Sequence, residues 1–497
     1  MNPLRKLAGQ TAIYGTTTIV YRLINYFLVP IHTYIFHNDQ YGVVSEMYAY
    51  VALLIVMLTY GMETAFFRYY DNKAIDKEKV YGTTLLSLII SSLIFVVFMV
   101  LFSQQIATLI RYKDHSEYII WFALMIVFDS ISTIPFAKLR VLNRPKMFAF
   151  IKLFGIAICF ILNILFLYGL PYFHKNNIFP GLISLMYRPD IGVGYIFIAN
   201  LISSGFTLLL LFIVIPMQKL TFDPVVWKRM MKYALPLLIF GLAGNINETF
   251  DRILLKYLSP AGVAMAQVGI YGACYKVSLL MTIVIQGFKY AAEPFFFSYA
   301  KETNARDVYA DIMKYFVIVC LLIFLGVMLY MDIIKYFIGN GKEFWEGLRI
   351  VPILLLANMF LGIFYNLSIW YKLTDKTRFG AYLSIFGAVV TLTLNFLLIP
   401  IIGYMGSAWA TFACYGSMMI LSFFIGQKHY YVKYNMKKIG LYFGLALALY
   451  FTSILIKSDV LTYRLVFNTV LFIFYVYVII YFEKPTLLKF KKQSNTH

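Results

Sequence analysis

Charged residues are scarce in this chain of 497 residues: only 13% are Asp, Glu, Lys or Arg, whereas 61% are hydrophobic. Soluble domains carry about 25% charged residues, so an ordinary water-facing surface is excluded. The apolar residues come in long blocks, such as Val80–Phe102 and Tyr463–Phe482. Blocks of this length span a hydrocarbon core about 30 Å thick. The sequence therefore predicts an all-α polytopic membrane protein.

Paired cysteines and enzyme motifs are also missing. The four cysteines lie singly inside apolar blocks without a CxxC spacing, so neither a disulfide framework nor a metal site is predicted. The chain has no HExxH, GxSxG, Walker A or DxD motif, and its loops are too short for a soluble catalytic domain. We expect no catalytic residue and no cofactor. Any pumping would draw on an H⁺ or Na⁺ gradient, the membrane potential or the substrate's own gradient.

Positive charge, in contrast, is in excess, with 43 Lys and Arg against 23 Asp and Glu and a net charge of +20. These residues recur in short loops, a pattern typical of membrane orientation rather than of a nucleic-acid partner. The N-terminus and every second loop hold nearly three times as many Lys and Arg as the other loops. This bias predicts that both termini are cytoplasmic. The apolar stretch after Met1–Gln10 runs to about Phe36, which favours a retained first membrane helix over a signal peptide.

Apolar windows bounded by charges, Gly and Pro predict fourteen membrane helices. Their approximate centres are Ile19, Val56, Ser91, Val127, Phe160, Gly205, Leu242, Leu279, Leu322, Met359, Val389, Met418, Ala446 and Phe472.

An internal repeat divides these helices. Phe154–Leu165 and Phe386–Leu397, 232 residues apart, share Phe-Gly and then Leu-Asn at identical spacing, each after a basic loop. Gln40-Tyr41-Gly42 more loosely resembles Gln267-Val268-Gly269. Because six helices separate the copies, we predict two parallel six-helix lobes around an axis along the membrane normal, with a cleft that alternates its access. The predicted parts are an N-lobe (residues 1–218), a C-lobe (219–430), and two further helices with a basic tail (431–497).

Ionisable residues recur inside the predicted helices. A charge at mid-bilayer costs at least about 2.5–3.5 kcal/mol, so it faces protein or water. We expect these helices to line a water-filled cavity between the lobes, whose cations bind a phosphate or pyrophosphate group. The candidate substrate-binding residues are Arg22, Asn25, Lys152, Arg252, Lys276 and Lys289.

Carboxylates in the same helices would compete with substrate for these cations, or carry a proton or sodium ion. The candidate ion-coupling or gating residues are Glu63, Asp129, Glu248, Asp251 and Glu293. Glu248 and Arg252 are four residues apart and can neutralise each other. The alternative is that these charges are structural ion pairs that lock helices together, and that Lys152 and Lys289 extend to the interface. The sequence leaves both interpretations open.

Three local patterns resemble the multidrug/oligosaccharidyl-lipid/polysaccharide (MOP) exporter superfamily, and within it the polysaccharide transporter branch. They are Gln40-Tyr41-Gly42, then Tyr60–Ala65 followed by Arg68-Tyr69, and the basic hairpin Lys138–Lys146 that leads to Gly155 and Asn163. The resemblance implies a V-shaped fold with a cationic cavity and a side opening for a lipid tail. By position, Arg22 would be the central cation of the N-lobe.

The resemblance also implies a bacterial inner-membrane flippase for O-antigen or capsule repeat units. Such a flippase moves undecaprenyl-pyrophosphate-linked oligosaccharide from the cytoplasmic to the periplasmic leaflet, among membrane lipids and beside glycan assembly proteins such as a polymerase or chain-length regulator. Two alternatives are a drug or metabolite cation antiporter of the same superfamily and a membrane polysaccharide polymerase or ligase. The mixed central charges, with Arg22 and Lys276 prominent, argue against the first, and the absence of a large outer loop argues against the second.

Overall fold

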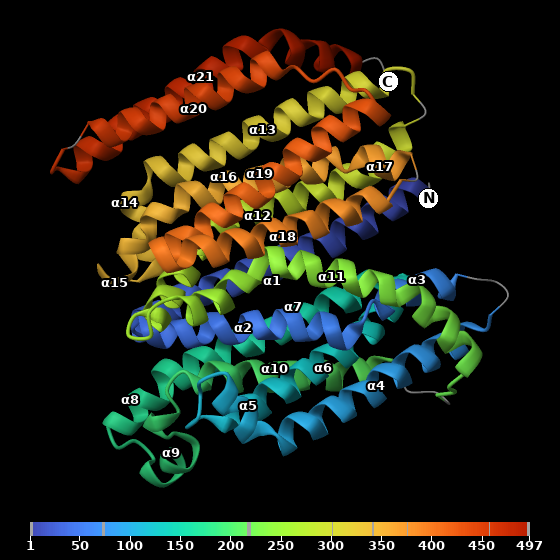
Figure 1. The fold of residues 1–497 in the computed structure, drawn as a ribbon, viewed down its shortest axis with the longest axis vertical. Coiled ribbons are helices and arrows are strands. Elements are labelled where there is room, and N and C mark those ends of the chain that lie inside the picture. The colour runs from blue at the N-terminus through green and yellow to red at the C-terminus, as the bar shows by residue number, and fades with distance from the viewer. Residues whose placement is uncertain are drawn as a thin grey trace. The chain divides into compact units, whose positions relative to one another are not determined.

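The computed structural model describes the backbone of residues 3–71, 75–215, 220–300, 302–339, 342–374, 376–456 and 458–494. Side chains are described between residues 13 and 484, apart from those gaps and positions 290, 291, 293, 294 and 298. Within these ranges the chain is almost entirely helical and forms no strand (Figure 1). The prediction of an all-α fold is therefore confirmed.

Backbone contacts divide the chain into two compact units. Unit 1 comprises Met1–Ala273 and Ser384–Ala410, and unit 2 comprises Cys274–Leu383 and Thr411–His497. The division passes through three helices, which are α12 (Ala264–Tyr299), α18 (Arg378–Ile402) and α19 (Tyr404–His429). Because it follows contacts rather than the sequence repeat, the boundaries of the predicted lobes stay a prediction.

Unit 1 contains the first eleven α-helices. They are α1 (Pro3–Ile35), α2 (Asn38–Thr59), α3 (Met62–Tyr70), α4 (Lys77–Leu101), α5 (Ser103–Leu109), α6 (Ser116–Val141), α7 (Pro145–Ile164), α8 (Leu170–Lys175), α9 (Pro180–Met186), α10 (Gly194–Val214) and α11 (Pro224–Leu258), with the π-helix η1 (Leu165–Gly169) and the 3₁₀-helix η2 (Pro189–Ile191). Helix α6 packs against α4 and α10, α7 packs against α1 and α10, and α11 packs against α2 and α3.

Unit 2 is built around α13. Its elements are α13 (Ala305–Leu329), α14 (Met331–Ile334), η3 (Lys335–Ile338), α15 (Lys342–Trp345), η4 (Glu346–Ile350), α16 (Val351–Leu367), α17 (Ile369–Leu373), α20 (Met436–Leu455) and α21 (Leu461–Ser494). Helix α13 contacts α16, α20 and α21, and α20 and α21 lie side by side along it (Figure 1).

Each of the fourteen predicted centres falls within a helix. Twelve helices in the described part of the chain are long and apolar enough to cross a membrane. The two long helices outside that set, α1 and α11, have 33 and 35 residues, and polar side chains interrupt both. In α11 they include Asn245, Glu248 and Asp251. Both are longer than a single span needs, as are α12 and α21 with 36 and 34 residues, so it is their polar residues and not their length that set α1 and α11 apart.

Local signals fix where several helices begin. The side chain of Asp223 accepts hydrogen bonds from the backbone N–H groups of Val225 and Val226, and Pro224 follows it as the first residue of α11. Asp76 caps α4 in the same way through the N–H of Glu78. Such side chains satisfy N–H groups that a helix start leaves without partners.

A left-handed pair of residues separates α2 from α3. Tyr60 and Gly61 have φ values of 33° and 74°. A Cβ on Gly61 would lie 2.8 Å from the carbonyl oxygen of Ala234 in α11, so both the backbone conformation and the close approach require glycine. The Tyr60-Gly61 pattern of the sequence thus bends the chain where α3 docks on α11.

The outward faces of the helices are apolar. In α21, only 11% of the most apolar window is buried, and Ile473, Phe474 and Ile480 are among its exposed side chains. An apolar surface of this extent is covered by lipid rather than by water. The chain is a multi-pass membrane protein.

The sequence repeat is visible in local hydrogen bonding. Asn163 in α7 and Asn395 in α18 are both fully buried, and each donates to the carbonyl four residues earlier, that of Cys159 or Thr391. The side-chain oxygen of each asparagine is bonded to a residue of another segment. His32 is the partner of Asn163, and Ser407 donates to Asn395. The repeated asparagines therefore have equivalent structural roles.

Candidate anion-binding site

Arg22 and Asn25 lie in α1 and are exposed. Among the described residues Arg22 forms neither an ion pair nor a hydrogen bond, while Asn25 contacts the hydroxyl of Tyr21. Arg22 is 19 residues from the start of α1 and 13 from its end, which places it well inside the span. Its guanidinium is thus available to an anion at this depth.

Lys152 in α7 is held over the faces of three aromatic rings. Its ammonium lies 5.3 Å from the ring centre of Tyr21, 5.2 Å from that of Phe136 and 5.8 Å from that of Phe148. Within the described part of unit 1 no carboxylate lies within 4.0 Å of it. Ring faces stabilise an ammonium without neutralising its charge. Lys152 is therefore both positioned and still able to bind an anion.

Two carboxylates and two arginines act on Lys152 at longer range. Its ammonium interacts electrostatically with Asp129, Glu63, Arg140 and Arg22. We call these five side chains the charged cluster of unit 1. The structure thus brings together four predicted site residues from α1, α3, α6 and α7, and adds Arg140, which the sequence placed only in a basic loop.

The charged cluster extends along the membrane normal. Arg140, at the end of α6, pairs with Glu63 at 3.2 Å, and both side chains are nearly half exposed. Asp129 lies eleven residues earlier in α6, about 16 Å further into the span at 1.5 Å per residue, and is hydrogen-bonded to Ser204. Within α6, the charges of the cluster therefore extend from the end of the helix at Arg140 to its interior at Asp129.

Arg252 and Asp251 in α11 behave differently. The Arg252 guanidinium pairs with the Asp251 carboxylate at 3.2 Å and donates to the backbone carbonyl of Glu248 at 2.8 Å. Tyr271 donates to the other oxygen of Asp251. Glu248 is exposed, and the carboxylate that pairs with the Arg252 guanidinium is that of the adjacent Asp251, a partner that the spacing of four residues did not indicate. A Glu248–Arg252 pair stays a prediction.

The remaining candidates belong to unit 2. Lys276 is half-buried in α12, and the ammonium of Lys289, in the same helix, lies 4.8 Å from the ring centre of Tyr365. The side chain of Glu293 lies outside the described residues. The cavity between lobes that would join these residues to Arg22 and Lys152 stays a prediction.

A buried ion pair in unit 1 was missed by sequence reasoning. Lys256 of α11 donates to Glu46 of α2 at 2.8 Å, and the two side chains are 4% and 0% exposed. Tyr112, between α5 and α6, donates to the same carboxylate, and the carbonyl of Ile110 accepts from Lys256. Burial raises the pKa of Tyr112 well above its ordinary value, which keeps the hydroxyl a donor.

Unit 2 contains a comparable network. Glu483 of α21 is 1% exposed and pairs with Lys314 of α13 and Lys438 of α20, each at 2.8 Å. Tyr442 donates to the same carboxylate. The partners of these buried pairs are more than 40 residues apart, so no periodicity within one helix could have indicated them. Both carboxylates are buried and both networks join helices. The charged side chains of the unit 1 network are almost fully buried, whereas Lys438 is 32% exposed.

Comparisons with known proteins bear on the family and on the fold. A family model described as polysaccharide biosynthesis protein matches residues 7–300. A comparison with curated protein sequences gives no significant match.

Among solved structures, the lipid II flippase MurJ in an inward closed conformation is similar with a TM-score of 0.69 and 14% identity, over 96% of this chain and 100% of that chain. An inward-facing multidrug resistance MATE family transporter of the MOP superfamily has a TM-score of 0.63 and 14% identity, over 83% and 94%. A MOP superfamily transporter from Pyrococcus furiosus, described as having a binding pocket of reverse polarity, has a TM-score of 0.58 and 15% identity, over 85% and 94%. At these identities the similarity shows the fold.

Proposed function

Because the chain belongs to the polysaccharide biosynthesis protein family and has the fold of MOP superfamily transporters, we propose that it is a flippase for undecaprenyl-pyrophosphate-linked oligosaccharide. It moves this repeat unit of O-antigen or capsule from the cytoplasmic to the periplasmic leaflet by alternating access. We place it in the bacterial inner membrane with both termini cytoplasmic, as the distribution of Lys and Arg indicates. Its partners are then the polymerase and chain-length regulator that receive the translocated unit.

The observation that carries the proposal is the position of Lys152. Its charge lies inside the membrane span, is held by three rings and has no contacting carboxylate in the described part of unit 1. Arg22, which interacts electrostatically with Lys152, has a planar guanidinium that can donate two parallel hydrogen bonds to phosphate oxygens. Together they can bind the two phosphates of a pyrophosphate, whereas an organic cation would be repelled.

The carboxylates of the charged cluster supply the candidate coupling sites. Asp129 and Glu63 both interact electrostatically with Lys152, so a proton or sodium ion on either one changes how strongly that lysine attracts substrate. We assign substrate release to the competition between these carboxylates and the substrate's phosphates for Lys152. Asp251 serves a structural role in this scheme, because Arg252 and Tyr271 occupy both of its oxygens.

Helix packing supports alternating access. A Cβ on Gly42 of α2 would lie 2.2 Å from the carbonyl oxygen of Met265, and a Cβ on Gly269 of α12 would lie 1.7 Å from that of Asn38. The two contacts mirror each other, and Gly42 and Gly269 are counterparts in the repeat. The predicted topology puts this contact at the outer ends of α2 and α12. Its opening would release substrate to the outer leaflet.

The test is complementation in cells that lack their own flippase. The Arg22→Ala variant should insert normally, abolish surface glycan and accumulate lipid-linked repeat units inside. Arg188→Ala removes an exposed cation, paired only with nearby Asp190 among the described residues, and should export like wild type. Normal surface glycan with Arg22→Ala would remove Arg22 from the mechanism.

Two further assays separate the alternatives. Export of an organic cation by vesicles that carry the purified protein, without movement of lipid-linked glycan, would establish an antiporter instead. Extension or transfer of a lipid-linked glycan by the purified protein would establish a polymerase or ligase.

A further inference from the structure

Unit 2 contains a pocket whose lining shares no residue with the charged cluster of unit 1. It is a partly open pocket, and the roughly 300 Å³ of space beside its lining includes open solvent. Lys289, Lys372 and Asn366 contribute its polar groups, and Phe288, Phe296 and Tyr365 contribute rings. Two ammonium groups beside an amide form a donor set suited to phosphate oxygens.

A buried donor in this pocket has no partner among the residues that the structure describes. Asn366 is 2% exposed, and its Nδ2 makes no hydrogen bond to any of them. An unsatisfied buried N–H costs about 1–3 kcal/mol, which a ligand that accepts from it would recover. This observation is independent of the lysines and points to an acceptor in the pocket.

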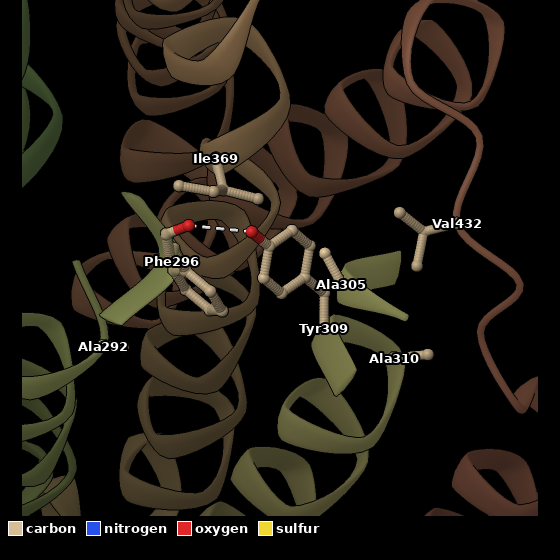
Figure 2. Close-up of a cluster of buried hydrophobic side chains, with 7 residues drawn as sticks. All are labelled: Ala292, Phe296, Ala305, Tyr309, Ala310, Ile369 and Val432. Carbon is tan, nitrogen blue, oxygen red and sulfur yellow. Dashed lines mark hydrogen bonds between the residues drawn. The ribbon is translucent and has the colours of Figure 1, made fainter. Parts of the chain in front are cut away.

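The base of the pocket is rigid. Ala292, Phe296 and Ile369 belong to a buried cluster with Ala305, Tyr309, Ala310 and Val432 (Figure 2). Figure 2 shows the hydroxyl of Tyr309 donating to the carbonyl of Phe296, at 2.7 Å. The end of α12 is thereby fixed against α13 and α17. Because these side chains are already packed, little conformational entropy is lost at this part of the pocket when a ligand binds.

The pocket lies at the depth of lipid head groups. The span that includes α16 and α17 ends at Leu373, one residue after Lys372. Lys289 of α12 lines the same pocket as Lys372. Lysines at span ends reach the layer where lipid phosphates lie. Lys372 is also the repeat counterpart of Arg140. Both repeats therefore place a cation at this level, on the side we assign to the cytoplasm.

We propose that the pocket formed by Lys289, Lys372 and Asn366 binds the phosphate of an anionic lipid head group at the cytoplasmic surface. The two lysines attract the phosphate, and the Asn366 amide donates to one of its oxygens. The site does not rest on the proposed flippase function, because it uses none of the residues of the charged cluster.

The test measures lipid binding to the purified full-length protein in neutral detergent by native mass spectrometry, with phosphatidylglycerol as the probe. Lys289→Gln and Lys372→Gln should each weaken binding about fivefold, and the double variant roughly thirtyfold, since a basic residue near the surface contributes about 1 kcal/mol. Asn366→Asp keeps the side-chain shape, places a carboxylate against the phosphate and should abolish binding. Lys376→Gln removes an exposed cation from the same loop, outside the pocket, and should bind like wild type.

A second arm identifies the source of the phosphate. Displacement of phosphatidylglycerol by millimolar inorganic phosphate would show that the phosphate group alone is recognised, and persistence would show that the lipid body is needed. The proposal is overturned if the double variant binds phosphatidylglycerol as wild type does, or if Lys376→Gln weakens binding equally. Glycan export, measured in parallel, reports on the flippase proposal separately.

Discussion

Unit 1 contains two groups of charges in its long helices, and they differ in whether a carboxylate contacts the lysine. Lys256 and Glu46 are in direct contact, sealed from solvent and further bonded to Tyr112 and the carbonyl of Ile110. Lys152 has ring faces around it and carboxylates only at longer range. A buried charge with a contacting partner holds helices together, whereas one held without neutralisation is available to a ligand. Each group is centred on a lysine, so the contacting carboxylate rather than the residue type distinguishes the two roles.

The largest effect is expected at the sealed pair. Lys256→Met leaves the Glu46 carboxylate buried without its counter-charge and should lower the free energy of unfolding by about 3–5 kcal/mol. The readout is thermal unfolding of the purified protein, together with the yield of folded protein from membranes. Glu46→Leu combined with Lys256→Met should recover much of the loss.

The matched control for that experiment is Arg349→Gln, since Arg349 and Glu346 form a pair that is more than half exposed. It should change stability by at most about 1 kcal/mol. Equal destabilisation by Lys256→Met and Arg349→Gln would show that burial does not distinguish the pairs.

A smaller effect is expected where α2 meets α12. Gly269→Ala places a methyl group against the carbonyl of Asn38 and should destabilise the protein by about 1–3 kcal/mol, because the helices have to separate. Gly444→Ala serves as control, since nothing lies within 4 Å of a Cβ added at that helical position. Thermal unfolding and glycan export of both variants should show losses for Gly269→Ala alone. Equal thermal unfolding and equal glycan export of the two variants would show that the contact between Gly269 and Asn38 has no part in the transport cycle.

The smallest effect on stability is expected at Glu63. Its pair with Arg140 is partly exposed, so Glu63→Gln should cost at most about 1 kcal/mol in unfolding. Because Glu63 also acts on Lys152, the variant should change how the rate of flipping depends on pH and sodium. If the flipping rate of Glu63→Gln depends on pH and on sodium concentration as that of the wild type does, Glu63 has a structural role only.

The fold was largely predictable from sequence because membrane insertion imposes long apolar blocks that any hydropathy window detects. All fourteen predicted centres lie in helices, including those of α1 and α11, whose polar residues weaken the signal. The repeat was detectable because the matching glycines and asparagines occupy tightly packed positions where larger or apolar residues do not fit.

The site was only partly predictable. The sequence identified Arg22, Lys152, Asp129 and Glu63, since charges in apolar helices are conspicuous, but it could not say which of them have contacting partners. Helical spacing suggested a Glu248–Arg252 pair, whereas the arginine turns to its neighbour Asp251. Pairs across helices, such as Glu46 with Lys256, depend on tertiary packing that no local pattern encodes.

The most direct test of the central claim is binding of undecaprenyl pyrophosphate to the purified protein, with Lys152→Gln beside wild type. A charge-assisted hydrogen bond contributes about 1.5–3 kcal/mol, so the variant should bind tenfold to a hundredfold more weakly while its thermal unfolding stays unchanged. Unchanged affinity in a folded Lys152→Gln protein would contradict the claim that this lysine holds the substrate's phosphates.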